Sequence, residues 1–342
     1  MGGLAGGVRA QNGDGVEVIM ARGGQRLRAL MARTEAHLDR VTAEAGAPLA
    51  AHANATVAAG GKRLRPLLVV LAAESAGGPA ADGGEERMVR AAVAVELVHS
   101  ATLVHDDLID AAQLRRGRPT VAAAAGRRMA VATGDLLFSR AFAELARNED
   151  SEQLEALSQA SSALAEGELL QRQDAWAAHV AVERYMHRCE LKTAALFEAA
   201  CRLGALNAVD GSRELAAALG AFARRIGLAF QMLDDILDVS GPVERTGKAR
   251  GTDLLDGTVT LPFILARERD AGLAGVDLRA LSGPRQAEAL CERIAATGAL
   301  DEAREQALGV VAGAKASLPE ILTGGRSELL ELVADAVVER YC

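Results

Sequence analysis

The sequence predicts an all-α protein, built as a single large helical bundle around a central cavity. Apolar residues recur every three or four positions over most of the chain, which is the pattern of amphipathic helices. Glycine and proline separate these stretches, as at Gly77-Gly78-Pro79 and Gly283-Pro284, and no stretch follows a βαβ order. Ten or more such helices in one bundle leave a central cavity where side chains converge. The clearest apolar series are Leu27, Leu30 and Met31, and later Leu215, Leu219, Phe222, Ile226 and Phe230.

Regular helical pattern begins near Gly24. We therefore expect a flexible N-terminal tail over residues 1–23 and one all-helical domain over residues 24–342. Translation from Met1 and from Met20 are both compatible with this boundary. The first residues lack the apolar stretch of a secretory signal, and no run of about 18 apolar residues is present to span a bilayer. The sequence predicts no transmembrane segment.

Charge and cysteine content narrow the class of protein further. The net charge is −8, which argues against a nucleic-acid partner. A polyanionic ligand remains compatible with an acidic protein when metal ions bridge the like charges. The four cysteines are scattered, without a C-x-x-C pair or a zinc-type cluster, which predicts a reduced, cytoplasmic setting.

The stretch from Ala91 to Leu108 is almost continuously apolar and ends in a run of carboxylates. A helix that is apolar on most faces belongs at the centre of a domain. Carboxylates at the end of such a helix are costly unless positive charge meets them. This juxtaposition indicates a functional site.

Two aspartate clusters share one spacing. They are Asp106, Asp107 and Asp110 in VHDDLID, and Asp234, Asp235 and Asp238 in MLDDILD. Residues four apart share a helix face, so the first and last carboxylates of each cluster repel each other by about a few tenths of a kcal/mol. One such cluster is typical of a solvated helix face, whereas two copies within apolar helices favour a function.

Carboxylate oxygens suit magnesium, which shares its coordination sphere with substrate phosphates. Two facing clusters therefore predict a metal clamp for a diphosphate. When a carbon–oxygen bond ionises, negative charge appears on the departing diphosphate, and metals and fixed cations aimed at that charge lower the barrier.

Basic residues accompany the acidic clusters. In GGKRLRP, Gly60 and Gly61 allow the backbone to approach a phosphate closely before a helix that begins near Leu64. A short basic stretch alone is usually a solvated face, but beside two acidic clusters it favours a diphosphate site. The basic residues concerned are Lys62, Arg63, Arg65, Arg115, Arg116, Lys192 and Lys248.

Over roughly residues 55–265 the sequence strongly resembles the trans-isoprenyl diphosphate synthase (polyprenyl synthetase) family. The matching motifs occur in order as GGKRLRP, ELVHSATLVHDDLID, RRGRPT, TGDLLFSRAF, EGELLQ, LKTAALFEAA, FQMLDDILD and GKARGTDLLDGTVTLP. The resemblance implies a bundle of the isoprenoid synthase type and a homodimer. It also implies a prenyltransferase that extends an allylic diphosphate with isopentenyl diphosphate.

The resemblance further implies a role for each matching position. Asp106 and Asp110 would bind two magnesium ions on the allylic diphosphate. Asp234 would hold a third ion with support from Asp235 and Asp238, while Asp107 completes the first cluster. The residues that would grip the allylic diphosphate are Arg115, Lys192 and Lys248. Those that would hold isopentenyl diphosphate are Lys62, Arg65, His99 and Arg116, with Arg63 in the same basic motif.

Thr193 and Gln231 would lie beside the allylic carbon, where cationic charge develops. The implied reaction is ionisation, attack by the isopentenyl double bond and proton loss to the departed diphosphate, without a protein nucleophile. One position departs from the family pattern, because Thr258 stands where a lysine often follows Gly257. This removes one cation near the allylic phosphate, and Lys248 and Arg250 are positioned in sequence to compensate.

Product length depends on the residues beneath the first cluster. Ala101 and Thr102 lie about 6–8 Å below Asp106 along a helix. Family members that make short products often carry aromatic rings there, so small residues predict an open channel. Phe138 and Phe142 would form a deeper floor. We expect a product of C30 or longer, with geranylgeranyl diphosphate as the alternative.

Three other classes compete with this interpretation. A class I terpene cyclase also uses an aspartate-rich helix, but cyclases line their pockets with aromatic rings, and this chain is only 3% aromatic. A regulatory subunit of a heteromeric synthase would be expected to lose a cluster, and both clusters are intact. A metal-free helical bundle would leave two buried acidic clusters unexplained.

Overall fold

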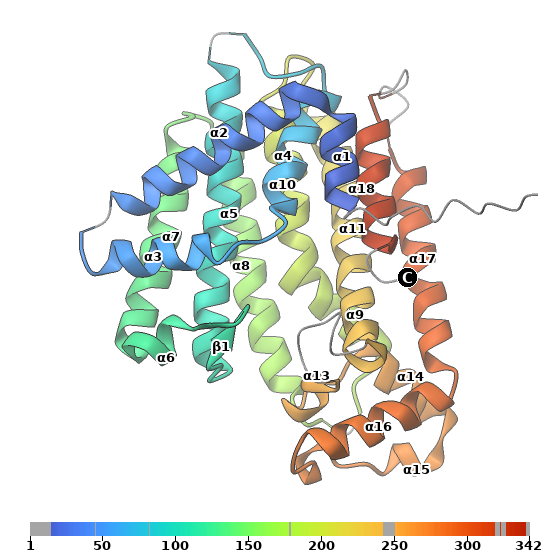
Figure 1. Ribbon diagram of the computed structural model, residues 1–342. Coiled ribbons are helices and arrows are strands. Elements are labelled where there is room, and N and C mark those ends of the chain that lie inside the picture. The colour runs from blue at the N-terminus through green and yellow to red at the C-terminus, as the bar shows by residue number, and fades with distance from the viewer. Residues whose placement is uncertain are drawn as a thin grey trace, which may run out of the picture.

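The computed structural model describes residues 15–44, 46–81, 83–177, 179–241, 250–318, 322 and 326–339. Helices make up nearly all of this region (Figure 1). The elements of the first half, helices apart from the short strands β1 and β2, are α1 (Gly15–Arg22), α2 (Gly24–Ala43), α3 (Leu49–Ala58), α4 (Leu64–Ser75), α5 (Gly84–Ile109), β1 (Leu114–Arg115), β2 (Arg118–Pro119), α6 (Val121–Ala125), α7 (Arg127–Ala146) and α8 (Ser151–Asp174).

The second half continues the bundle, and its segments between residues 252 and 296 lie together at the lower end in Figure 1, before the last two helices run back along the bundle. Its elements are α9 (Val182–Cys189), the π-helical turn η1 (Glu190–Ala194), α10 (Ala195–Leu206), α11 (Arg213–Ser240), α13 (Thr252–Leu255), α14 (Leu261–Arg269), α15 (Ala271–Ala274), η2 (Leu278–Ala280), α16 (Pro284–Ala296), α17 (Ala299–Ala316) and α18 (Glu328–Glu339). The predicted all-α bundle is confirmed.

Helix α5 forms the centre of the first half. It packs against α2, α4, α7 and α10, and its residues from Ala91 to Val98 are all buried. Among the described residues, α5 is the one helix long and apolar enough to cross a membrane by length and composition. Because 72% of its most apolar window is buried inside the protein, α5 has the character of a core helix.

Helix α11 forms the centre of the second half. The side chain of Ser212 accepts a hydrogen bond from the backbone of Leu215 and caps the start of the helix. The apolar face of α11 packs against α10 and α17. Gly227 lets the helix approach η1 closely, since a Cβ there would lie 2.7 Å from Cα of Ala194. This contact places the second aspartate cluster beside the π-helical turn.

A second close approach joins α8 to the same turn. A Cβ on Gly167 would lie 2.6 Å from the backbone nitrogen of Lys192, so only glycine fits without a shift. The turn itself widens the helix locally, and π-helical turns occur frequently at functional sites. The lysine-threonine pair of η1 is therefore held between α8 and α11.

The only strands in the described part of the chain form a short hairpin after α5. Leu114 pairs with Pro119, and Arg115 pairs with Arg118. The two connecting residues, Arg116 and Gly117, have φ values of 51° and 74°. Two positive φ values in succession are the signature of the tight turn that matches the twist of paired strands. The hairpin fixes two adjacent arginines next to the first aspartate cluster.

The N-terminal segment differs from the expected flexible tail where it can be described. Residues 15–22 form α1, and α1 packs against α18 with Ile19 fully buried. The contact is long-range in sequence, which is why local pattern did not indicate it. Residues 1–14 lie outside the described residues. The expected boundary between residues 23 and 24 stays a prediction, and α1 argues for an earlier start of the folded part.

Candidate active site

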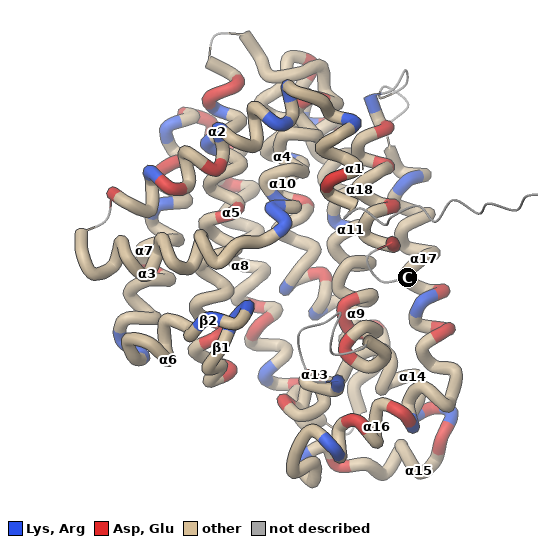
Figure 2. The backbone as a smooth tube through the Cα atoms, viewed as in Figure 1, with Lys and Arg blue, Asp and Glu red and all other residues tan. Residues whose placement is uncertain are grey.

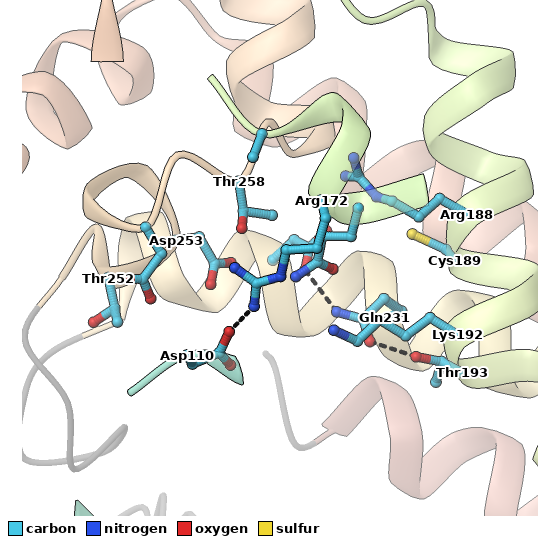
Figure 3. Close-up of a pocket in the computed structure, with 14 residues that line it drawn as sticks. Asp110, Arg172, Arg188, Cys189, Lys192, Thr193, Gln231, Thr252, Asp253 and Thr258 are labelled. Carbon is cyan, nitrogen blue, oxygen red and sulfur yellow. Dashed lines mark hydrogen bonds and ion pairs between the residues drawn. The ribbon is translucent and has the colours of Figure 1, made fainter. Parts of the chain in front are cut away.

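Two cavities lie on either side of the C-terminal half of α5. The first has a volume of about 190 Å³ and lies between α5, α8, η1, α11 and α13. Figure 3 shows its side chains converging from these elements. Its lining residues are Asp110, Gln171, Arg172, Ala175, Arg188, Cys189, Lys192, Thr193, Gln231, Asp235, Thr252, Asp253, Asp256 and Thr258. Five of these were predicted site residues, and they come from three separate segments.

The three aspartates at the end of α5 face two different sides of the helix. Asp110 is at the first cavity and forms an ion pair with Arg172 of α8. Asp107 is buried and accepts hydrogen bonds from Nε of Arg115 at 2.8 and 2.9 Å. Burial raises the pKa of Asp106 to about 6, although the positive charge of Lys192 acts in the opposite direction. Asp106 and Asp110 therefore face the cations of α8 and η1, whereas Asp107 faces the hairpin.

The second aspartate cluster, on α11, is held in place through hydrogen bonds to Asp235. Asp235 is 4% exposed and accepts hydrogen bonds from the hydroxyl of Tyr185 at 2.7 Å and from Nε2 of Gln231 at 2.8 Å. Burial raises the pKa of Asp235 to about 7, against the effect of those hydrogen bonds. Asp234 is exposed, and Asp238 accepts a hydrogen bond from the backbone of Asp253 at 3.2 Å.

A polar chain connects η1 to α11 across the floor of the first cavity. The hydroxyl of Thr193 donates to Oε1 of Gln231 at 2.7 Å, and the same amide donates onward to Asp235. Thr193 and Asp235 therefore fix the orientation of the Gln231 amide, with its oxygen toward Thr193 and its nitrogen toward Asp235. Thr193 and Gln231, which the resemblance placed beside the reacting carbon, lie next to each other in this cavity.

A chain of alternating charges crosses the opposite wall, from Asp110 through Arg172 and Glu168 to Lys192. Nε of Arg172 donates to Oε1 of Glu168 at 3.0 Å, and Lys192 pairs with the other carboxylate oxygen. Burial acts to raise the pKa of Glu168, but Lys192 and Arg172 outweigh it and lower that pKa. Lys192, predicted to bind diphosphate, thus has a carboxylate partner in Glu168.

The second cavity, of about 300 Å³, lies between α3, α5, α6 and the hairpin. Its lining includes a basic group that we call the mouth, namely Arg63, His99, Arg115 and Arg116, although most of the lining is apolar. Figure 2 shows basic residues of the hairpin beside the acidic end of α5. The other lining residues are His52, Ala55, Thr56, Ala59, Gly60, Glu96, Ser100, Leu103, Val104, Asp107, Arg118, Pro119, Thr120, Val121 and Ala124.

The GGKRLRP segment contributes to this mouth in several ways. A Cβ on Gly61 would lie 3.1 Å from Nη1 of Arg116, so the glycine lets the segment and the hairpin meet. Arg63 is held by Glu35 at 2.6 Å and by Glu96 at 2.8 Å. Lys62 is exposed. Arg63 therefore supports the segment through ion pairs as well as lining the cavity.

Arg65 and His99 are half-buried charged or titratable residues beside this mouth. Burial lowers the pKa of Arg65 to about 10, and its guanidinium lies 4.8 Å from the ring centre of Phe197. Within the described part of the chain, Nε of Arg65 has no hydrogen-bond partner. Burial, reinforced by Arg65 and Arg116, holds the pKa of His99 well below its usual value of 6.5. The region is strongly electropositive, which suits an anion.

The residues expected to control product length are Ala101 and Thr102 on α5 and Phe138 and Phe142 on α7. Ala101 is fully buried, whereas Thr102 is half-buried and its hydroxyl donates to the backbone oxygen of His99 at 2.8 Å. The rings of Phe138 and His105 lie 5.9 Å apart. Phe142 is half-buried and packs on the core.

Three groups of site residues need comment beyond the sequence expectations. Arg115 lines the second cavity and holds Asp107, whereas the resemblance implied contact with the allylic diphosphate. Lys248 lies outside the described residues. Sequence reasoning also did not single out Arg172, Arg188 and Asp253, which line the first cavity, or Glu168 and Tyr185, which contact its lining residues Lys192 and Asp235. The signal for Glu168 was present in EGELLQ, and that for Asp253 in GTDLLDGT.

The donor set of the first cavity fits a hard divalent cation. Asp110, Asp235 and Asp253 bring carboxylates from three elements to one cavity. Within the described residues, no three carboxylates, imidazoles or thiols are gathered closely enough to hold a metal ion by themselves. Magnesium is often bound by one or two carboxylates together with substrate phosphates, so a diphosphate would complete such a site.

The bundle and its paired acidic helices define an all-α enzyme of the isoprenoid synthase type. A family model described as Polyprenyl synthetase matches residues 47–294. The chain therefore belongs to the polyprenyl synthetase family, and it is a prenyltransferase whose substrates are isoprenyl diphosphates.

Several characterised relatives cover most of the chain. It is 40% identical to heptaprenyl diphosphate synthase component 2 of Geobacillus stearothermophilus, over 69% of this chain and 72% of that protein. It is 36% identical to geranylgeranyl diphosphate synthase of Methanosarcina mazei, over 83% of this chain and 87% of that protein. It is 35% identical to octaprenyl diphosphate synthase of Escherichia coli, over 73% of this chain and 77% of that protein.

Solved structures match the whole bundle. The decaprenyl diphosphate synthase of Rhodobacter capsulatus has a TM-score of 0.85 at 32% identity, covering 94% of this chain and 99% of that one. The polyprenyl synthase of Caulobacter crescentus, solved with calcium and isoprenyl diphosphate, has a TM-score of 0.83 at 35% identity, covering 93% and 98%. The named products range from geranylgeranyl to decaprenyl, so product length differs between members with this fold.

Proposed function

We propose that the protein is a magnesium-dependent polyprenyl diphosphate synthase that catalyses head-to-tail (1′-4) condensation of isopentenyl diphosphate with an allylic diphosphate. The observation that carries this proposal is the meeting of Asp110 from α5 and Asp235 from α11 in one cavity with Lys192. The second cavity, with its basic mouth, adjoins it across α5. Two neighbouring anion sites are what a reaction between two diphosphates requires.

The allylic diphosphate belongs in the first cavity. Asp106 and Asp110 of α5, with Asp234 and Asp238 of α11, are the residues that would hold magnesium there, and three ions fit the family pattern. Bound magnesium supplies electrostatic stabilisation of the negative charge that develops on the leaving diphosphate. Lys192 adds a fixed cation on the same side, once it leaves Glu168.

Isopentenyl diphosphate belongs at the mouth of the second cavity, where Lys62, Arg65, His99 and Arg116 are the proposed ligands. The buried guanidinium of Arg65 supports this role, because its Nε lacks a hydrogen-bond partner among the described residues. A buried donor without a partner is costly, so an anion that satisfies it binds favourably. His99 stays neutral and donates one N–H without adding charge.

Thr193 and Gln231 face the carbon at which positive charge develops. Since the Gln231 amide donates to Asp235 and its oxygen accepts from Thr193, the hydroxyl oxygen keeps its lone pairs available toward the cavity. Oxygen lone pairs stabilise an adjacent carbocation electrostatically. The double bond of isopentenyl diphosphate then attacks, and the released proton passes to the departed diphosphate.

We propose a product of C30 or longer. Ala101 and Thr102 leave the level below Asp106 without an aromatic ring. Of the two residues expected to form a deeper floor, Phe138 lies beside His105, at the level of Asp106, so Phe142 is the one we propose for that role. Geranylgeranyl diphosphate is the second candidate, because the Methanosarcina mazei geranylgeranyl diphosphate synthase is 36% identical over most of both chains.

We also propose that the enzyme is a cytoplasmic homodimer. The Geobacillus stearothermophilus relative is named as one component of its enzyme, which makes a second, different subunit the competing arrangement. Light scattering of the purified chain, combined with an activity assay of the same fraction, distinguishes them. Activity in a fraction of twice the chain mass supports the homodimer, whereas activity that requires an added cell component contradicts it.

The function is tested by incubating the purified protein with radiolabelled isopentenyl diphosphate, an allylic primer and magnesium, and then omitting each component in turn. Mass analysis of the products gives their length. The expected result is product that requires all three components and peaks at C30 or longer. A dominant C15 product would contradict the open channel, and no product with any primer would contradict the assignment.

A further inference from the structure

Arg172 reaches into the first cavity from α8, and Figure 3 shows its guanidinium between Asp110 and Asp253. Nη2 of Arg172 pairs with Asp110, while Nε donates to Glu168 on the preceding turn of the same helix. The side chains of Arg172 and Asp110 are 37% and 36% exposed, so solvent and ions have access to the pair. Arg172 thus occupies a carboxylate that the proposed function assigns to the metal.

The other cations at this cavity are already committed to partners. Arg188 is buried, pairs with Asp174 at 3.4 Å and donates to the backbone oxygen of Val259 at 2.6 Å. Lys192 pairs with Glu168. The acidic residues that line the same cavity are Asp110, Asp235, Asp253 and Asp256. Arg172 is therefore the cation of this cavity that pairs with Asp110.

We infer that Arg172 is a positioning residue that holds the carboxylate of Asp110 and competes with a divalent cation for it. The inference rests on the proposed function, since it needs Asp110 to be a metal ligand. A cation at Asp110 must displace the guanidinium and also meets its repulsion. Arg172 consequently raises the metal concentration that the enzyme needs.

Displacement does not leave Arg172 without a partner. The guanidinium keeps its hydrogen bond to Oε1 of Glu168 and can turn its fork onto both oxygens of that carboxylate. Lys192 shares the same carboxylate, so a tighter hold by Arg172 weakens the hold on Lys192. Metal binding at Asp110 therefore frees Lys192 for the diphosphate, which couples the two events through Glu168.

The test is Mn²⁺ binding in the presence of inorganic pyrophosphate, followed by the electron paramagnetic resonance signal of free Mn²⁺. Arg172→Gln is expected to bind Mn²⁺ about two- to fivefold more tightly than wild type, the change that one partly exposed ion pair supports. Arg172→Lys keeps the positive charge, but an ammonium group cannot contact Asp110 and Glu168 at once as the guanidinium does. We therefore expect its affinity for Mn²⁺ to lie between those of wild type and Arg172→Gln. Equal or weaker binding by both variants would overturn the inference.

The matched control is Arg213→Gln, which removes the same charge at the far end of α11, where Arg213 pairs with Glu152. Its Mn²⁺ affinity is expected to equal that of wild type. A gain as large as that of Arg172→Gln would show a general charge effect and reject a specific role for Arg172. A residue with only a structural role would not tighten metal binding when removed.

Wild-type turnover separates this inference from the proposed function. If wild type elongates an allylic primer and Arg172→Gln binds Mn²⁺ no more tightly, the inference fails alone. If wild type makes no product but Arg172→Gln binds Mn²⁺ more tightly and Arg213→Gln does not, the competition at Asp110 stands and the proposed reaction fails. If Arg172→Gln does not fold, Arg172→Lys provides the test. An Mn²⁺ affinity of Arg172→Lys equal to or weaker than that of wild type contradicts the inference.

Discussion

The hydroxyl of Tyr185 donates to the carboxylate of Asp235 at 2.7 Å, beneath the second aspartate cluster. Tyr185 is fully buried on α9, and Asp235 is 4% exposed on α11. The same carboxylate accepts from Gln231, which in turn accepts from Thr193. One buried tyrosine therefore orients a chain of polar groups that ends at the reacting surface of the cavity.

Tyr185→Phe is expected to destabilise the protein and lower turnover. The change removes a donor from a buried carboxylate, and leaving such a group unsatisfied costs about 1–3 kcal/mol. Denaturant unfolding measures the loss. A double-mutant cycle with Asp235→Asn isolates the pair, and additive effects of the two changes would contradict a direct interaction.

Stability of the metal-free protein is expected to fall as pH rises from about 4 to about 7, through Asp235. Burial raises the folded-state pKa of Asp235 to about 7 from an ordinary value of 3.8. Between these values the folded state binds more protons than the unfolded state, so the free energy of unfolding decreases as pH rises. The effect is largest at and above the folded pKa and amounts to the order of a few kcal/mol.

The measurement is denaturant unfolding in a chelator at several pH values, for wild type and for Asp235→Asn. The difference between the two profiles removes the contribution of all other titrating groups. Wild type should lose stability relative to the variant across this window. Parallel profiles would show that Asp235 has an ordinary pKa in the folded protein.

Part of the first cavity could be predicted from local sequence pattern, whereas the rest depends on how the helices pack against one another. The spacing of Asp106 and Asp110 placed both on one helix face, because the helical period is local. The same geometry turns Asp107 by about 100° toward the hairpin, where Arg115 holds it. The pairing of Arg172 with Asp110 joins residues 62 positions apart, so it depends on the packing of α8 beside α5. No local pattern carries that information.

The same distinction explains the N-terminus and the cluster on α11. Ile19 is buried through the contact of α1 with α18, which lies at the other end of the sequence. Tyr185 lies 50 positions before Asp235, and the sequence shows it only as one aromatic residue in an amphipathic helix. The aspartates of the repeated motif could be predicted from the sequence, whereas a buried partner such as Tyr185 could not.

Asp106→Ala and Asp234→Ala are each expected to reduce turnover by orders of magnitude while helix content stays unchanged. Each removes a proposed metal ligand from the end of a helix whose apolar packing lies elsewhere. Activity assays at saturating magnesium, with circular dichroism of the same samples, test this. Asp301→Ala, an exposed carboxylate on α17, is the control and should retain activity. Near-normal turnover in either cluster variant would remove that residue from the metal site.

Thr102→Phe is expected to shorten the product. The side chain of Thr102 is half-buried one turn below Asp106, so a ring there would obstruct a growing chain at that level. Ala101 is fully buried, and a ring at position 101 would instead overpack the core at a cost of about 1–3 kcal/mol. Mass analysis of products from Thr102→Phe decides the point. An unchanged length distribution would place the channel along a different face of α5.

Thr258→Lys is expected to lower KM for the allylic diphosphate about three- to tenfold, with kcat little changed, since a charge-assisted hydrogen bond in a partly open site contributes on this scale. Thr258 lines the first cavity beside Asp253 and Asp256, and Gly257 places it there by packing against the ring of Trp176. A lysine at position 258 would aim a cation at the diphosphate from the α13 side, opposite Lys192. Gln159→Lys adds the same charge on the exposed surface of α8 and should leave KM unchanged. A KM that does not change in Thr258→Lys would show that the bound diphosphate lies out of reach of this segment.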